Sequence, residues 1–264
     1  MIAHNQIRDL LSRPALQPVW EKLLKLCHAG MNYGGGQSVR SSGELGALNF
    51  ASRYFKPNGP IVIFDVGAND GEYIEAARRV ISHSDLHIFS FEPQYSCFQA
   101  LQSSYGDDPH VCLRQAALGK EVGTVDLFFS EAGSSSASLH RVETHAGSRS
   151  ESVEMTTVDD VCQEKGLEYI DFLKIDTEGH EIDVLLGARL MVQAGRITAI
   201  QFEFGDTFLH TNYHFHDIFN MLSPSHTIFR ILRSGLIEVP RYTHDLEIFK
   251  LANFLCIRKD AVSH

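Results

Sequence analysis

Three side chains that can take up a proton follow two apolar segments of the sequence. Asp176 and His180 come directly after segment 172–175, and Glu203 lies near the end of segment 197–204. If both segments are parallel strands, their carboxyl ends meet at one edge of a sheet, so we expect these side chains to lie close together. A carboxylate or imidazole there could deprotonate a hydroxyl group, which is a weak nucleophile until it loses its proton. The spacing therefore predicts a base beside an acceptor hydroxyl.

The roles within this group stay open from the sequence alone. His180 can titrate near neutral pH, and Asp176 could orient its imidazole or act as the base itself. Glu178 and Glu181 also stand near the positive end of the following helix, where they would stabilise the helix rather than react. We expect that structural role for Glu181. Lys174, within the preceding strand, is expected to form a structural ion pair.

A divalent metal ion is a second interpretation of the same carboxylates. Asp176, Glu203 and a histidine could bind Mg²⁺ or Mn²⁺, which would polarise the acceptor hydroxyl and lower its pKa. His210 and His214 lie just beyond and would share one face if the segment were helical. Histidine clusters without a fixed acidic or cysteine partner often line surfaces or substrates. A required metal is therefore the less favoured interpretation, and we assign no metal ligand.

A glycine-rich loop follows an earlier apolar segment, 61–66. Gly67 and Gly71 let the backbone turn sharply and approach a ligand closely. The dinucleotide fingerprint G-x-G-x-x-G would need glycine at positions 69 and 72, where this chain has Asn69 and Glu72. The loop therefore does not match a pyrophosphate site.

Negative charge around the loop favours a different ligand. Asp65, Asp70 and Glu72 would repel a pyrophosphate but suit a ligand with an ammonium and a sulfonium group, as in S-adenosylmethionine (SAM). Glu92 ends the next strand, where an acidic residue can accept both hydroxyls of a ribose. Together these features predict SAM as cofactor. The candidate cofactor contacts are Asp65, Gly67, Ala68, Asn69, Gly71, Tyr73, Glu92, Pro93 and Ala116.

Apolar segments and helical patterns alternate along the chain, which predicts an α/β fold with a mainly parallel, doubly wound sheet. The expected strands are 61–66, 87–91, 111–117, 124–129, 152–156, 172–175, 197–204, 227–232 and 252–257. The expected helices are 72–82, 95–105, 158–165, 181–191 and 215–222. Residues 1–56 form a helical N-terminal extension or cap, and residues 57–264 form the cofactor-binding domain. Helical patterning at 7–27 is interrupted near Pro14 and Pro18.

Several of these segments resemble the FkbM family of methyltransferases. The matching segments are 64–71 (Phe-Asp-Val-Gly-Ala-Asn-Asp-Gly), 91–93 (Phe-Glu-Pro), 171–181, 187–188, 201–204 and 253–255. The stretch Lys-Ile-Asp-Thr-Glu-Gly-His at 174–180 is the most distinctive, and the similarity runs from about residue 61 to residue 257.

The resemblance implies a Rossmann-like class I methyltransferase fold, SAM as cofactor and methyl transfer to a hydroxyl oxygen. It also implies cofactor contacts at Asp65, Gly67, Asn69, Gly71 and Glu92. Substrates in the family are typically hydroxyls of sugars, polysaccharides or secondary metabolites. The resemblance thus defines the chemistry more closely than the acceptor.

The leading prediction is a SAM-dependent O-methyltransferase that acts on a sugar, a polysaccharide or a related polyhydroxyl metabolite. One alternative is methylation of a macrolide-type hydroxyl with metal assistance. Another is an NAD(P)-dependent oxidoreductase, which the missing fingerprint disfavours, and a third is a nucleoside-binding scaffold without activity. Candidate substrate contacts are Tyr33, Glu178, Tyr213 and His214. Segment 134–138, rich in serine, is a candidate lid.

Composition restricts the partners and the compartment. The formal net charge is −10, with 33 acidic and 23 basic side chains, so we expect no nucleic-acid partner. The five cysteines include no C-x-x-C pair, which argues against zinc and for a reducing compartment. No signal peptide or membrane-spanning run is evident. We expect a cytoplasmic enzyme with a small-molecule or carbohydrate substrate, compatible with homo-oligomerisation.

Overall fold

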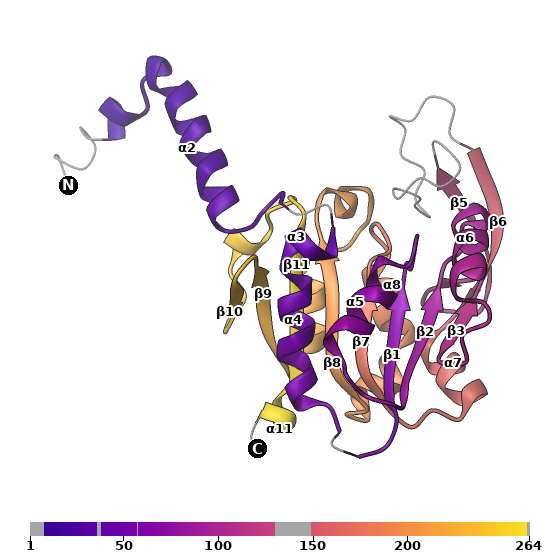
Figure 1. Ribbon diagram of the computed structural model, residues 1–264. Coiled ribbons are helices and arrows are strands. Elements are labelled where there is room, and N and C mark those ends of the chain that lie inside the picture. Colours follow the sequence, from indigo (N-terminus) through magenta and orange to yellow (C-terminus); the bar gives the residue numbers. More distant parts are fainter. Residues whose placement is uncertain (1–7, 36–37, 57, 130–148, 263–264) are drawn as a thin grey trace.

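The computed structural model describes residues 8–35, 38–56, 58–129 and 149–262. These residues form an eight-stranded sheet in the order β10-β9-β11-β8-β7-β1-β2-β3 and a three-stranded sheet in the order β4-β6-β5 (Figure 1). The strands of the large sheet are β1 (Ile61–Val66), β2 (Leu86–Phe91), β3 (Val111–Arg114), β7 (Ile170–Ile175), β8 (Ile197–Phe204), β9 (His226–Leu232), β10 (Gly235–Glu238) and β11 (Ala252–Arg258). The small sheet contains β4 (Ala117–Leu118), β5 (Gly123–Phe129) and β6 (Arg149–Thr156).

Five neighbouring strands of the large sheet, from β3 through β2, β1 and β7 to β8, run parallel. Strand β11 runs antiparallel to β8 and β9, and β10 runs antiparallel to β9. All six residues of β1 are buried, as expected of a strand that is covered on both faces. The predicted Rossmann-like class I fold with a mainly parallel sheet is confirmed.

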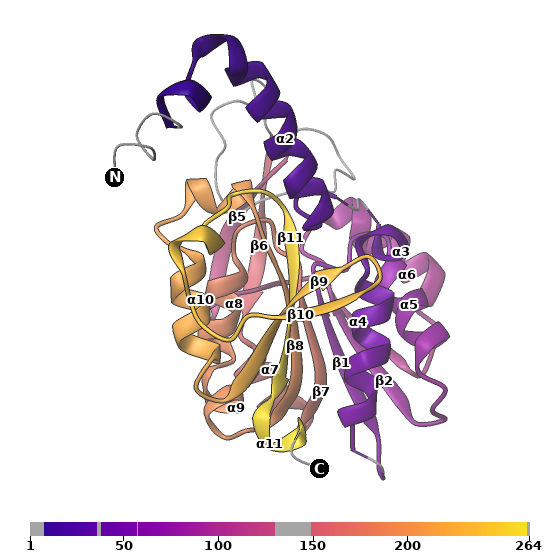
Figure 2. The same ribbon diagram turned by 90° about the vertical axis from the view of Figure 1, so that its left-hand side faces the viewer.

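Helices cover both faces of the large sheet (Figures 1 and 2). On β1, Ile61 and Ile63 pack on one face and Val62 and Phe64 on the other, because successive side chains of a strand alternate. The first face carries α4 (Glu44–Ala51), α5 (Glu72–Val80) and α6 (Tyr95–Tyr105), and the second carries α7 (Val158–Lys165), α8 (Glu181–Gly187), α9 (Arg189–Gln193) and α10 (Phe215–Leu222). Shorter helical segments are η1 (Pro14–Leu16), α3 (Val39–Ser42), η2 (Ser52–Tyr54), η3 (Asp206–His210), η4 (His244–Leu246) and α11 (Lys259–Val262).

The structure differs most clearly from the predicted elements at three places. The strand expected at 111–117 ends at Arg114, because the chain turns there and β4 pairs instead with β6 in the small sheet. The helix expected at 181–191 is divided into α8 and α9, with Ala188 between them at φ −101° and ψ 8°. Strand β10 was not expected, since its short sequence shows no strong apolar alternation.

Within residues 1–56, the described part consists of two structurally different pieces. Helix α2 (Gln17–Gly30) projects from the body and has no buried residue (Figures 1 and 2). Helix α4, by contrast, packs on the sheet through Ala47, Leu48 and Ala51, which are all buried. The division at residue 56 remains a prediction. Across the described residues, none of the helices has both the length and the apolar character required for a membrane span.

Two helical glycines provide a matched test of the packing. A Cβ atom at Gly187 would lie 2.0 Å from the carbonyl oxygen of Gly119, whereas one at Gly46 would meet no atom within 4 Å. We expect Gly187→Ala to lower the free energy of unfolding by about 1–3 kcal/mol through overpacking. Gly46→Ala should raise it by about 0.5–1 kcal/mol, since alanine favours the helix. Urea denaturation of both variants measures these changes. If the free energy of unfolding changed equally and in the same direction in both, the close contact of α8 with Gly119, just after β4, would be contradicted.

Candidate active site

A cavity of about 500 Å³ opens at the carboxyl ends of β1, β2, β7 and β8. Of the nine predicted cofactor contacts, Gly67, Ala68, Asn69, Tyr73, Glu92, Pro93 and Ala116 line it. The other two do not line it: Asp65 is fully buried, and Gly71 is the N-cap residue of α5. The cavity therefore gathers the segments that the sequence singled out, although their roles toward a ligand remain predictions.

The glycine loop has the conformation that its residues allow. Gly67 lies at φ +81°, and a Cβ atom there would be 1.8 Å from the carbonyl oxygen of Asp176. Gly71 lies at φ +87°, where a Cβ atom would meet the ring of Tyr105 at 2.7 Å. Both positions require glycine, because a left-handed backbone and close packing coincide. The loop can thus turn directly from β1 into α5 at the cavity wall.

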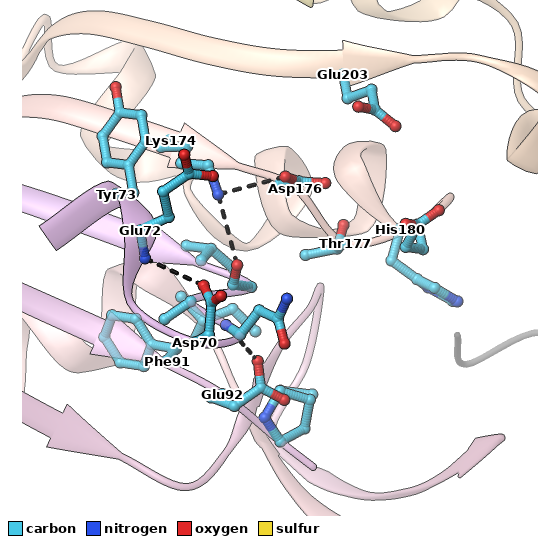
Figure 3. Close-up of a pocket in the computed structure, with 18 of the residues that line it drawn as sticks. Asp70, Glu72, Tyr73, Phe91, Glu92, Lys174, Asp176, Thr177, His180 and Glu203 are labelled. Atoms are coloured by element: carbon cyan, nitrogen blue, oxygen red, sulfur yellow. Dashed lines mark hydrogen bonds and ion pairs between the residues drawn. The ribbon is translucent and has the colours of Figure 1, made fainter. Parts of the chain in front are cut away.

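Glu92 is held at this wall by two backbone amides. Its Oε2 accepts a hydrogen bond from the Asn69 amide at 2.8 Å (Figure 3). Its Oε1 accepts one from the Gln94 amide at 2.8 Å. Burial raises the pKa of Glu92 to about 7, although these two bonds oppose the shift. Each carboxylate oxygen has a second lone pair. Glu92 can therefore still accept two hydroxyl groups from a ligand in the cavity.

Lys174 forms the predicted ion pair and joins β1 to β7. Its Nζ lies 3.4 Å from Oδ1 of Asp65. It also lies 3.4 Å from Oδ2 of Asp176 (Figure 3). It also donates a hydrogen bond to the carbonyl oxygen of Gly67 at 3.4 Å. Burial alone would lower the pKa of Lys174, but Asp176, Asp65 and Glu44 raise it above its ordinary value. The ammonium group is thus held in its charged form beneath the glycine loop.

The three predicted catalytic residues, Asp176, His180 and Glu203, all line the cavity, together with Glu178. Figure 3 shows Asp176 and Glu203 extending from neighbouring strand ends, with His180 farther along the same wall. Burial first, and then the charges of Asp176 and Glu178, raise the pKa of Glu203 well above its ordinary value. Burial and Asp176 likewise raise the pKa of Glu178 to about 8. The cavity is therefore an acidic pocket with a high affinity for protons or other positive charge.

The carboxylate beside the His180 imidazole is not Asp176, which the sequence suggested could orient it. His180 Nδ1 lies 3.3 Å from Oδ2 of Asp183, so Asp183 orients the imidazole, whereas Asp176 pairs with Lys174. Tyr213 donates its hydroxyl to the other oxygen of Asp183 at 3.1 Å. Burial would raise the pKa of Asp183, but its contacts with His180, Lys120 and Tyr213 lower it overall.

Glu181 has the structural role that was expected. Its carboxylate accepts hydrogen bonds from the backbone amides of Thr177 at 3.0 Å and Gly179 at 3.1 Å. These bonds close the turn between β7 and α8, where Glu178 adopts φ +54°. The turn positions the carboxylates at the cavity, and Glu181 itself does not line it.

Glu44 is a cavity residue that the sequence did not indicate. It begins α4, is buried, and lines the cavity opposite the glycine loop's strand. Ser42 Oγ donates to its Oε1 at 2.7 Å, and Gln201 Nε2 donates to its Oε2 at 2.6 Å. Burial raises the pKa of Glu44. Its N-terminal segment lacks a motif with recognisable chemistry, so only the packing of α4 on the sheet reveals its position.

Three predicted substrate contacts lie outside the lining of this cavity. Tyr33 is buried, and its hydroxyl accepts a hydrogen bond from Arg230 at 3.0 Å. Tyr213 binds Asp183, and His214 is exposed at the start of α10. Their roles toward a substrate remain predictions. The candidate lid at 134–138 falls outside the described residues.

No group of three or more histidine, cysteine, aspartate or glutamate side chains arranged to hold a metal ion occurs in the described parts of the chain.

An open, mainly parallel sheet with an acidic cavity at its strand ends, and a buried glutamate after the second strand, defines a class I methyltransferase. The model of the Methyltransferase FkbM domain matches residues 65–230, well over half of the chain. The chain belongs to this family, and it is a methyltransferase. The predicted family is thus confirmed, and the oxidoreductase alternative loses its basis.

Two relatives with assigned activities are similar to this chain. It is 26% identical over 186 residues to the 2-O-methyltransferase NoeI of Sinorhizobium fredii, which covers 66% of this chain and 71% of that protein. It is 23% identical over 144 residues to the hexuronic acid methyltransferase AglP of Haloferax volcanii, which covers 54% of this chain and 56% of that protein. The chain therefore spans little more than half the length of the second relative.

Solved structures with a similar fold include a methyltransferase FkbM from Methylobacillus flagellatus. It has 17% sequence identity and a TM-score of 0.47, and the match covers 74% of this chain and 43% of that one. The plantazolicin methyltransferase BpumL, solved in complex with SAH, has 9% identity and a TM-score of 0.41, over 98% of this chain and 100% of that one.

The raised pKa of Glu178 makes stability depend on pH. The unfolded chain releases this proton near pH 4.5 and the folded chain near pH 8, so the folded state binds the additional proton between these values. The contribution of Glu178 is therefore fully present below about pH 4.5 and is lost as the pH rises through about 8. Glu178→Gln removes this titrating group. Between acidic and alkaline pH, we expect the free energy of unfolding to fall by about 1–3 kcal/mol less in the variant than in the wild type.

Urea denaturation across that pH range measures the effect. Glu168→Gln, at an exposed position outside the cavity, is the matched control and should leave the pH profile unchanged. Identical profiles for wild type and Glu178→Gln would show that Glu178 titrates normally.

Proposed function

We propose that this chain is a SAM-dependent O-methyltransferase that acts on a hydroxyl group of a sugar or related polyhydroxyl acceptor. The observation that carries the proposal is one cavity with two distinct ends. Glu92, held by backbone amides, lies at one end, and Asp176 and Glu203 lie at the other. The first end suits a ribose, and the second suits an acceptor hydroxyl.

The cavity fits SAM in size and in charge. Its volume of about 500 Å³ is in the range of small-molecule sites. Glu44, Asp70, Glu72 and Asp176 contribute carboxylates to its lining, which complements a ligand with an ammonium and a sulfonium group. When bound, SAM supplies an electrophilic methyl group. Burial raises the pKa values of Glu92 and Glu178, and nearby carboxylates raise that of Glu178 further, so a cationic ligand would stabilise the ionised form of both groups.

The acceptor end can orient a hydroxyl and remove its proton. Asp176, paired with Lys174, keeps its side chain 38% exposed toward the cavity, so it can accept a hydrogen bond from the hydroxyl and align it. The raised pKa of Glu203 makes its ionised carboxylate a strong proton acceptor. We therefore assign the base to Glu203 and the orienting role to Asp176.

The acceptor class rests on the two relatives. One is named a 2-O-methyltransferase and the other a hexuronic acid methyltransferase. A sugar ring offers several hydroxyls to the carboxylates that line the acceptor end. The polar, acidic lining of that end is compatible with such an acceptor, whereas a large apolar macrolide would need an apolar wall.

The function is tested by incubating the protein with SAM that carries a labelled methyl group and with neutral sugars, hexuronic acids and oligosaccharides. The product should retain its label after mild alkali, since a methyl ether survives where a methyl ester hydrolyses. Activity should persist in EDTA. Label that alkali removes would assign methylation to a carboxylate, and loss of activity in EDTA would support the metal-assisted alternative.

Replacing Glu92 tests the cofactor end. Glu92→Gln loses a charge and places an amide NH₂ group against a backbone N–H donor. We expect the Kd for SAM to rise about 10- to 100-fold, measured by isothermal titration calorimetry. Glu121→Gln, at an exposed position outside the cavity, is the control. Unchanged affinity in Glu92→Gln would remove the ribose assignment.

Replacing the two acceptor-end carboxylates tests the chemistry. Glu203→Gln should lower kcat about 10²- to 10⁴-fold while the Kd for SAM changes only a few-fold, because a general base acts on the acceptor. Asp176→Asn should raise KM for the acceptor as well as lower kcat, since it orients the hydroxyl. If Asp176→Asn lost kcat and Glu203→Gln did not, the two roles would be reversed.

A further inference from the structure

The N-terminal arm, residues 8–30, stands apart from the rest of the molecule. It consists of helical residues 8–11, η1 and α2, and it extends away from the body in both views (Figures 1 and 2). None of its residues is buried, and only Leu16 and His28 are partly covered. A single helix of 14 residues is marginally stable in water, so this arm requires a surface that covers it.

The arm presents an apolar stripe. Leu16, Trp20, Leu23 and Cys27 recur at spacings of three and four, which places them on one helical face with Leu24 beside them. Seven of the twelve exposed large hydrophobic side chains of the described residues lie on the arm. Trp20 is 38% exposed and Leu24 is 55% exposed. This concentration contrasts with the body, where the other five are scattered over separate elements.

The polar side of the arm is basic. The arm carries four basic and two acidic side chains, a formal charge of +2, and the basic ones are Arg8, Arg13, Lys22 and Lys25. Since the whole chain has a charge of −10, the remainder carries −12. An amphipathic helix with leucine and tryptophan on one face and lysine or arginine on the other is typical of segments that lie in the interface of an anionic membrane.

The position of the arm relates it to the active site. Just after α2, the Gly34 amide donates a hydrogen bond to the carbonyl oxygen of Leu251 at 2.7 Å, and Leu251 lines the cavity. The arm therefore starts at the cavity rim, and Figure 1 shows it rising on the side where the parallel strands end.

We propose that this arm docks on the surface of an anionic lipid bilayer, with its apolar stripe among the lipids and its basic side chains toward the headgroups. The charge of the arm is complementary to such a surface. The proposal rests on the arm alone and is independent of the acceptor and of the chemistry proposed above.

The chain contains a single tryptophan, Trp20, which makes its fluorescence a direct reporter of the arm. We expect vesicles of phosphatidylcholine with phosphatidylglycerol to shift the emission of Trp20 to shorter wavelength and to carry the protein upward in flotation. Vesicles of phosphatidylcholine alone, or high salt, should do neither, since the attraction is electrostatic at long range.

The double variant Leu23→Glu/Leu24→Glu should partition onto anionic vesicles at least about tenfold more weakly, because the variant lacks two leucine side chains that would enter the lipid. Leu190→Glu, at an exposed leucine of the body, is the matched control and should bind like wild type. Both variants should keep the circular dichroism spectrum of the wild type, since neither position is buried.

Two results would overturn the proposal. Absence of an emission shift and of flotation with anionic vesicles would show that lipid does not cover the arm. A blue shift that grows with protein concentration without lipid, together with a dimer in sedimentation velocity that Leu23→Glu/Leu24→Glu abolishes, would assign the arm to a second copy of the chain instead. Methyl-transfer activity on a water-soluble acceptor enters neither readout, so failure here leaves the proposed function untouched.

Discussion

The buried ammonium group of Lys174 is the interaction on which the site depends. It sits between carboxylates of two adjacent strand ends, Asp65 on β1 and Asp176 after β7, and it binds the carbonyl oxygen of Gly67. A buried charge is costly unless it is paired, so this arrangement stabilises the relative position of the two strand ends and the glycine loop. The same pairing orients Asp176 at the cavity. A single buried cation thereby couples the cofactor loop to the acceptor end.

Around that cation, carboxylates outnumber positive charges in the cavity lining, and burial raises the pKa values of several of them. Burial raises the pKa of Glu92 to about 7 and that of Glu178 to about 8, and it raises the pKa of Glu203 well above its ordinary value. Perturbed groups of this kind gather at functional sites more often than elsewhere. Burying these carboxylates is unfavourable, and the fold compensates for part of the cost through backbone amides that donate hydrogen bonds to Glu92 and Glu181. The electrostatic cost is what gives the cavity its affinity for a cationic ligand and for the proton of an acceptor.

The N-terminal segment contributes to the molecule in two ways. Helix α4 buries Leu48 against the sheet and brings Glu44 into the cavity, so part of the site comes from outside the family match at residues 65–230. Helix α2 contributes nothing to the core and carries its apolar side chains outward. The segment that was predicted as one helical extension therefore divides into a structural part and an arm suited to a partner surface.

The sequence by itself determined the α/β class, the mainly parallel sheet, and most of the segments that line the cavity. These features are local: buried strands read as continuous apolar runs, and a turn such as that at Gly67 needs a particular residue type. Only the tertiary structure decided which side chains pair. The sequence suggested Asp176 as the partner of His180, but the imidazole contacts the carboxylate of Asp183, which lies one helical turn after His180. Glu44 was not among the site residues predicted from the sequence. Its contact with β8 depends on how α4 packs against a strand that is distant in the sequence, and local patterns do not predict such contacts.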